Sequence, residues 1–212
     1  LLYTAYTSPD SCVPAENAEI ISLASQFTAV PKKNPYQKAL SVYNYMLDTY
    51  KLLPNTRTGN ISPLDLLDEK IGDSYDFAIV FTALCRAIGI PAVPVSGVLV
   101  ESNSATKNHW WSEIYFEDYG WFPVDVAMGA GFAQKMGIEL QGEQLRAFYF
   151  GSLDAQHITF SRGYKEIKPS FANGHTVLLE RTYALQSIWE ESNNVLAGYS
   201  SLWNAPVITG IY

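Results

Sequence analysis

A run of apolar residues at helical spacing occupies the middle of the chain, at residues 72–91. Apolar side chains recur every three or four positions, which predicts a helix, and further apolar residues fill most of the remaining circumference. Asp73 or Ser74 can cap its start by accepting a backbone N–H bond. Gly89 and Pro91 end it, because glycine adopts the left-handed cap conformation and proline cannot continue the hydrogen-bond ladder. We therefore expect a helix buried nearly all round, with a polar residue and free N–H donors at its N-terminus.

Three shorter helical patterns precede this central helix. Residues 17–29 place their apolar side chains on one face. Residues 35–50 do the same after Asn34, which is expected to be the N-cap of that helix. Ser62 is expected to cap a short helix at residues 63–69.

The apolar period changes from 3.6 to 2 after the central helix. Residues 91–100, 108–116 and 121–126 predict three strands separated by polar or turn-forming residues. In the second of these, one face carries His109, Trp111, Glu113 and Tyr115, and the other carries Trp110, Ser112, Ile114 and Phe116.

The signals at the two ends of the chain are weaker. Residues 1–16 show no period and predict an extended lead-in. Residues 129–131 predict a loop and residues 142–148 a helix, while residues 148–161 and 176–189 predict further strands or extended segments.

This order, helices first and strands afterwards, predicts an α+β fold with helices packed on an antiparallel sheet. The sequence shows no internal repeat, low-complexity tract or linker. We therefore expect one domain over residues 1–212, with a core at about residues 35–130 and with additional strands and a C-terminal extension at residues 131–212.

Composition and charge narrow the class of protein. The chain has 212 residues, of which 48% are hydrophobic, enough to bury a substantial core. Its net charge of −7 argues against nucleic acid as a partner, because phosphate binding needs a basic face. No apolar run reaches the ~18 residues needed for a membrane span.

The chain opens with Leu-Leu-Tyr rather than Met, so we expect that a segment has been removed. The aromatic-rich, lysine-poor composition favours an extracytoplasmic location. The oligomeric state stays open.

The two cysteines, Cys12 and Cys85, are expected to be free thiols. Cys85 lies on the apolar face of the central helix, where it would act as a small hydrophobic side chain. Two cysteines cannot form a structural zinc site unaided, and we expect no metal site. Asp65, Asp68 and Glu69 are interpreted as a solvated helix face.

Three residues could carry chemistry: Ser74, His109 and Asp125. If the strands bearing His109 and Asp125 pair as a hairpin, both side chains can face the same way, and the start of the central helix would have to bring Ser74 to them. An acid that orients an imidazole facing a nucleophile is the general triad arrangement. Each residue also has a structural interpretation, as an N-cap, a packed histidine and a turn residue. His157 and His175 are interpreted as surface or structural residues.

These residues lie in three motifs that, in their order and spacing, resemble the transglutaminase-like superfamily. The motifs are Gly72-Asp73-Ser74-Tyr75-Asp76-Phe77-Ala78 with Ala83-Leu84-Cys85-Arg86-Ala87-Ile88-Gly89-Ile90-Pro91, then His109-Trp110-Trp111-Ser112-Glu113-Ile114-Tyr115, and then Gly120-Trp121-Phe122-Pro123-Val124-Asp125. The resemblance covers roughly residues 35–130, and the segment at residues 149–154 is similar to one in bacterial members.

The resemblance implies a papain-like α+β core and acyl-enzyme chemistry on a peptide or protein substrate, with a glycan-linked substrate also open. It implies that His109 is the catalytic imidazole, that Asp125 orients it, and that no cofactor is needed; no calcium-binding loop is evident. Trp110 and Trp111 are candidates for lining the substrate cleft, with core packing expected for one of them.

The chain departs from the family at the nucleophile, because Ser74 stands where the motif has cysteine. Cys85 cannot replace it, since eleven helical residues separate the two by ~16 Å. A thiol near pKa ~8.5 becomes a thiolate beside an imidazolium, whereas a hydroxyl stays protonated after the same shift. We therefore expect absent or very low activity in this sequence. A native or an engineered serine, a non-catalytic module that binds a peptide or glycan, and a true serine hydrolase all remain open.

Overall fold

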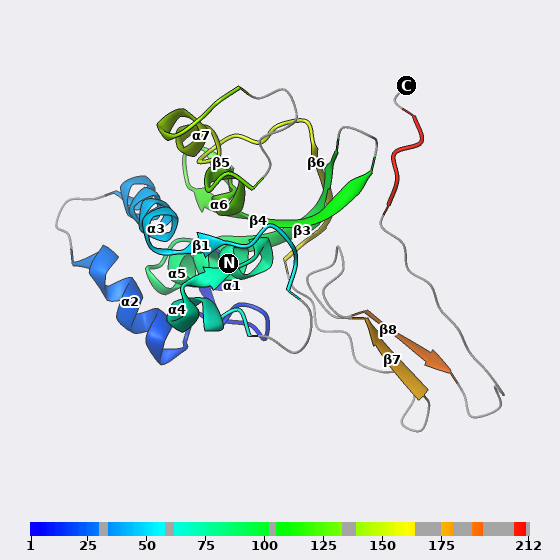
Figure 1. Ribbon diagram of the computed structural model, residues 1–212. Helices are drawn as coiled ribbons and strands as arrows, with labels where there is room; N and C mark the ends of the chain where they lie inside the picture. Colours follow the sequence, from blue (N-terminus) through cyan, green and yellow to red (C-terminus); the bar gives the residue numbers. More distant parts are fainter. Residues whose placement is uncertain are drawn as a thin grey trace.

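The computed structural model (Figure 1) describes residues 1–29, 34–57, 62–101, 105–132, 139–163, 175–179, 188–192 and 206–210. Its helices are α1 (Leu2–Thr7), α2 (Ala18–Thr28), α3 (Pro35–Thr49), α4 (Asp65–Glu69), α5 (Ser74–Ala87), α6 (Val126–Gly129) and α7 (Glu143–Phe148). Its strands are β1 (Lys51–Leu52), β2 (Ile71–Gly72), β3 (Ala92–Val100), β4 (Thr106–Phe116), β5 (Gly120–Val124), β6 (His157–Arg162), β7 (His175–Leu179) and β8 (Ile188–Ser192).

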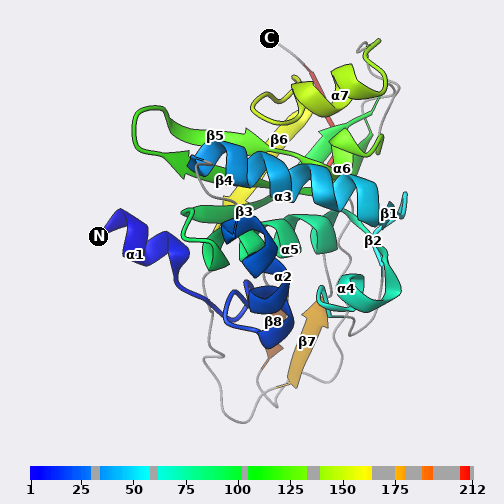
Figure 2. The ribbon, with the colours of Figure 1, turned by 90° about the vertical axis from the view of Figure 1, so that its left-hand side faces the viewer.

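The main sheet has the strand order β5-β4-β3-β6, and every neighbouring pair is antiparallel. α5 packs on one face of this sheet, and α3 runs alongside α5 (Figure 2). The opposite face is covered by a smaller cluster in which Val93, Val95 and Trp111 pack with Tyr6, Trp121 and Leu153. This arrangement confirms the predicted α+β fold.

α5 is the buried centre of the molecule, as its apolar pattern predicts. All of its residues except Tyr75 and Ala87 are buried. Asp73 is the N-cap, and its side chain accepts from the Asp76 N–H, while the Asp76 side chain accepts from the Asp73 N–H. Gly89 has φ of +80° and follows the helix as predicted. Ser74 is therefore the first helical residue, not the cap.

A buried polar link fixes α5 on the sheet. The hydroxyls of Thr82 and Ser112 lie 3.0 Å apart, and the Ser112 hydroxyl donates to the Ala78 carbonyl at 3.1 Å. All three groups lie in the interior, where an unpaired hydroxyl is costly. The link therefore favours one position of α5 along β4.

Two helices differ from the sequence prediction. Residues 1–16 are not wholly extended, because α1 forms there and its Tyr6 ring packs edge-on against Trp121 with centroids 4.9 Å apart. The third strand ends at Val124 instead of residue 126, because the Asp125 side chain caps α6 by accepting from the Met128 N–H at 2.8 Å. The cap of α6 is a local contact, since Met128 follows Asp125 by three residues, whereas the packing of α1 depends on Trp121 in a distant strand.

Most other predicted elements are confirmed, with small shifts of their bounds. Asn34 caps α3, and its capping box with Gln37 is complete. The Ser62 hydroxyl accepts a hydrogen bond from the Leu64 N–H. The N-cap of α4 is nevertheless Leu64 and not Ser62, because the helix begins two residues later than predicted. β7 and β8 pair antiparallel in the predicted segment 176–189, of which residues 180–187 lie outside the described part of the chain. The division into domains stays a prediction.

Within the described residues, no helix combines the length and apolar character that a membrane crossing requires.

Candidate active site

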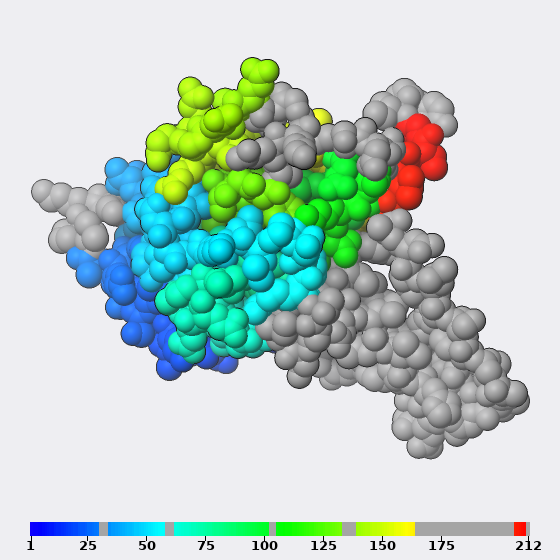
Figure 3. All heavy atoms as spheres, viewed as in Figure 1, coloured from blue at the N-terminus to red at the C-terminus, as the bar shows by residue number. Residues whose placement is uncertain are grey.

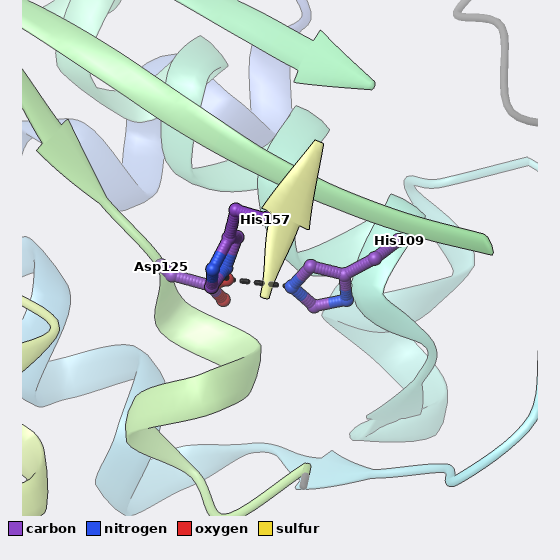
Figure 4. A group of neighbouring side chains, drawn as sticks. All are labelled: His109, Asp125 and His157. Carbon is purple, nitrogen blue, oxygen red and sulfur yellow. Dashed lines mark hydrogen bonds and ion pairs between the residues drawn. The ribbon is translucent and has the colours of Figure 1, made fainter. Parts of the chain in front are cut away.

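His109 and Asp125 come together in the interior through the β4–β5 hairpin. Val124 pairs with Ser112, so Asp125 follows at the level of Trp111, on the face that also carries His109. The Nε2 atom of His109 lies 2.5 Å from Oδ2 of Asp125, and both side chains are 0% exposed (Figure 4). This is the hairpin geometry that the sequence predicts for the pair.

The hydrogen bond fixes the state of the His109 ring. The Asp125 carboxylate is an acceptor, so the ring nitrogen that faces it carries the proton. In the neutral ring the lone pair then lies on Nδ1, which is buried and has no hydrogen-bond partner in the described part of the chain. An orphaned, buried imidazole nitrogen is suited to accept a proton from a nucleophile.

Ser74 lies at the start of α5, next to the strand segment that carries His109. The residues that follow Ser74 and His109, Tyr75 and Trp110, are in edge-on ring contact with centroids 5.6 Å apart. Ser74 is 1% exposed. Because Nδ1 of His109 has no partner among the described residues, the Ser74 hydroxyl does not bond to the ring. The start of α5 thus packs against the segment of β4 that carries His109, and the Ser74 hydroxyl is not bonded to the ring.

A second imidazole, which the sequence analysis assigns to the surface or to structure, joins this pair. His157 on β6 has a side chain that is 3% exposed, and its Nε2 lies 3.0 Å from the same Oδ2 of Asp125. Its Nδ1 lies 2.8 Å from Oδ1 of Asp154, whose Oδ2 accepts from the Tyr149 hydroxyl at 2.5 Å. His109, Asp125, His157, Asp154 and Tyr149 form one hydrogen-bonded network, which we call the His–Asp network.

Sequence reasoning could have found part of the network. Tyr149 and Asp154 bound the segment that resembles bacterial members, and His157 follows Asp154 by three residues at the start of a strand. The pairing of β6 with β3, on the side of β3 away from β4, brings these residues to His109. That pairing joins segments about 60 residues apart, and no local period reveals it.

The network has a defined electrostatic state. Burial raises the pKa of Asp125, but the charges of His109 and His157 and their hydrogen bonds outweigh burial and hold that pKa well below its ordinary value. Burial lowers the pKa of His157, but hydrogen bonds to Asp125 and Asp154 and their charges outweigh it and raise that pKa to about 9. At neutral pH Asp125 and Asp154 are therefore carboxylates, and His157 is an imidazolium.

His109 is covered on its outer side. The Phe132 ring stacks on it with centroids 4.9 Å apart, and the ammonium of Lys107 lies 4.4 Å from the Phe132 centroid. The same ammonium bonds to the Pro54 carbonyl, beyond β1. Figure 3 shows the blue and cyan residues of α3 and its following segment lying directly against the yellow-green α6 and α7. A cavity of about 540 Å³ opens along this boundary, lined by residues that include Pro54, Gly131 and Phe132.

Both tryptophans proposed to bind substrate are in the interior. Trp110 and Trp111 are each 1% exposed, and they belong to different hydrophobic clusters on the two faces of the sheet. Core packing was expected for one of them. The structure assigns core packing to both, because β4 is a central strand and neither of its faces is open at this point.

Both cysteines are free and buried, as expected. Burial raises the pKa of Cys12 to about 12, and it also raises that of Cys85. Neither thiol is a thiolate at neutral pH, so neither offers a nucleophile in place of Ser74.

One group of residues has spacing that could hold a metal ion in the described part of the chain. His109, Asp125 and His157 place their ligand atoms within 4.8 Å of one another. Hydrogen bonds within the network already account for Nε2 of both rings and for the carboxylate, so we interpret the group by proton chemistry.

The chain belongs to the transglutaminase-like superfamily, whose model matches residues 21–126. These residues include α5 and both members of the His109–Asp125 pair. No curated protein matches the chain.

Solved structures with a related fold are found in bacteria. A candidate cysteine protease from Cytophaga hutchinsonii aligns with a TM-score of 0.50 at 23% identity, covering 58% of this chain and 41% of that chain. The periplasmic domain of TgpA from Pseudomonas aeruginosa aligns with a TM-score of 0.48 at 17% identity, covering 59% of this chain and 46% of that one. The alignments thus span less than half of each of these two relatives.

Proposed function

We propose that this chain carries an acyl-transfer site of the cysteine peptidase or amidase kind, acting on a peptide or protein amide, in which Ser74 occupies the position of the nucleophile. The observation that carries the proposal is the buried His109–Asp125 pair with a free Nδ1, placed beside the start of α5. Membership of the superfamily supports the assignment of that position.

The roles follow from the chemistry of a thiol at residue 74. His109 takes the thiol proton at Nδ1, and the sulfur attacks the amide carbonyl carbon to give a tetrahedral oxyanion. The C–N bond then breaks as His109 returns the proton to the leaving amine, and water or an amine resolves the acyl-enzyme. The backbone N–H of residue 74 is suited to stabilise the oxyanion, because the first N–H groups of a helix have no intrahelical acceptor.

Serine at this position makes the site inactive or nearly so. A hydroxyl does not ionise beside an imidazolium, so it can react only if His109 removes its proton during attack. That route needs a hydrogen bond from the hydroxyl to Nδ1, and Nδ1 has no partner within the described residues. An extracytoplasmic location, favoured by the composition, is part of the same proposal.

The variant Ser74→Cys tests the proposal. Iodoacetamide should alkylate the introduced thiol at pH 6 at least ~10-fold faster than Cys12 or Cys85, because a thiolate paired with an imidazolium forms well below pKa ~8.5. The alkylated peptide is identified by mass spectrometry. The double variant Ser74→Cys/His109→Asn serves as the control and should lose the advantage.

Two other outcomes favour the alternatives. Reaction of the introduced thiol at the rate of an ordinary cysteine, with the protein folded, would refute catalysis and favour a module that binds a peptide or glycan. Labelling of the unmodified chain at Ser74 by a fluorophosphonate probe would instead establish a serine hydrolase.

A further inference from the structure

His157 is the member of the His–Asp network that the proposed acyl-transfer chemistry does not use. It comes from β6, outside the residues that match the superfamily model. Its ring lies edge-on to Trp111 with centroids 5.1 Å apart and near His109 at 5.6 Å. Its side chain is 3% exposed, so its hydrogen bonds decide its charge.

Both ring nitrogens of His157 face carboxylates. Nε2 meets Oδ2 of Asp125 at 3.0 Å, and Nδ1 meets Oδ1 of Asp154 at 2.8 Å. A neutral imidazole has one N–H, so it could satisfy only one of these acceptors. The Tyr149 hydroxyl and the Gln156 N–H also donate to Asp154, which keeps Asp154 an acceptor. The geometry therefore requires both nitrogens of His157 to carry protons.

We propose that His157 is a positioning residue that holds Asp125 and, as an imidazolium at neutral and mildly acidic pH, sets the charge around the catalytic pair; this inference rests on the proposed function. Oδ2 of Asp125 is shared by the two rings, and Oδ1 is held by the Met128 N–H. The carboxylate is thus restrained at both oxygens, and its orientation toward His109 is fixed before any substrate binds.

The charges of the network balance only when both rings, His109 and His157, are imidazolium ions. Asp125 and Asp154 contribute two negative charges and His157 one positive charge. The network is therefore neutral when His109 is also protonated, which is the state needed beside a thiolate. In a dry interior a charge-balanced cluster is favoured over one with a net charge. Without Asp154, two imidazolium rings would share one carboxylate.

The groups that face His157 come from every element packed around it. They are His109 on β4, Asp125 at the start of α6, Tyr149 at the end of α7 and Asp154 before β6. Of these, only the two carboxylates carry a negative charge at mildly acidic pH. Removing His157 and removing Asp154 should thus change the local charge by one unit in opposite directions.

The experiment takes Ser74→Cys as the parent and measures how the rate of alkylation of its introduced thiol depends on pH. The acid limb of the rate profile, where the reactive thiolate forms, should move to higher pH by about 0.5–1 unit in His157→Gln, because a nearby positive charge is lost. It should move to lower pH by a similar amount in Asp154→Asn, because a nearby negative charge is lost. The comparison is made below pH ~6, under the ordinary pKa of 6.5 and with Asp125 still facing Nε2 of His157, so that His157 keeps its charge in Asp154→Asn.

The control is Thr159→Ser, an exposed position on the same strand, which should leave the limb in place. Opposite shifts in the two variants support the inference. Absence of a shift, or shifts in the same direction, overturns the inference, because with a purely structural role the direction of the shift would not depend on the sign of the charge removed. If one of the two variants does not fold, the other still tests the direction of its own predicted shift. Failure of the proposed function is recognised separately, since the alkylation rate of the parent Ser74→Cys would then rise only near pH ~8.5, as for an ordinary thiol, and this inference would fall with it.

Discussion

The charge on His157 predicts a specific pH dependence of stability. Interactions with Asp125 and Asp154 raise the pKa of His157 from 6.5 to about 9, against the opposing effect of burial. A raised pKa in the folded state means that folding stabilises the protonated ring. The stabilisation is complete below pH 6.5, where the ring is protonated in both states, and it is lost as the pH rises from 6.5 to about 9.

The magnitude follows from the size of the shift. One pKa unit corresponds to ~1.4 kcal/mol, so the rise predicts that about 3 kcal/mol of unfolding free energy is lost between pH 6 and 10. Because the side chain is 3% exposed, solvent screening removes little of this value. The variant His157→Gln lacks the titration. The difference in unfolding free energy between the unsubstituted protein and the variant should therefore shrink by about 3 kcal/mol over this pH range.

Urea unfolding measures the effect, with fluorescence of the five tryptophans as the signal. Wild type and His157→Gln are compared at pH 6, 7.5 and 10 at constant ionic strength, so that titrations common to both proteins cancel. A difference that stays constant with pH would show that His157 is not held as an imidazolium. That result would refute both the electrostatic reasoning and the charge count of the network.

Two further substitutions test how the fold supports the site. Gly97→Ala should destabilise the protein by about 1–3 kcal/mol in urea unfolding, because a Cβ there would lie 1.9 Å from the Ile158 carbonyl oxygen and push β6 away; an unchanged unfolding midpoint would contradict this packing. Arg57→Met should lower the free energy of unfolding by about 3 kcal/mol, because it removes the guanidinium that lies 2.8 Å from the 0% exposed Asp76 side chain at the start of α5. Arg57→Lys should recover only part of this loss. Equal unfolding temperatures of Arg57→Met and the unsubstituted protein would refute the prediction.

The elements near the candidate catalytic residues were the most predictable part of the fold. α5 carries its own start and stop signals, Asp73 and Gly89, and an apolar pattern strong enough to predict burial all round. The alternating pattern of β4 placed His109 and Trp111 on one face, and the hairpin to β5 then brought Asp125 to His109. These features depend on residues close together in the chain, so local pattern predicts them.

The burial of the two tryptophans and the role of His157 depended on long-range packing. Trp110 and Trp111 lie on opposite faces of a strand, and only the layers that cover each face decide that both are buried. His157 gained its partners when β6 paired with β3, because that pairing brings it to Asp125 while Asp154 lies three residues before it. A sequence does not show which distant segment will supply a partner for a buried charge.

The sequence alone determined the residue types on which the proposed chemistry depends: a serine at the helix start, an imidazole on β4 and a carboxylate directly after β5. The tertiary structure decided their states. Burial removed water from His109 and Asp125, and the contact with His157 placed a positive charge beside the shared carboxylate. The physical reason is that hydrogen-bond partners and desolvation, which set protonation, come from the three-dimensional surroundings of a residue and not from its neighbours in the chain.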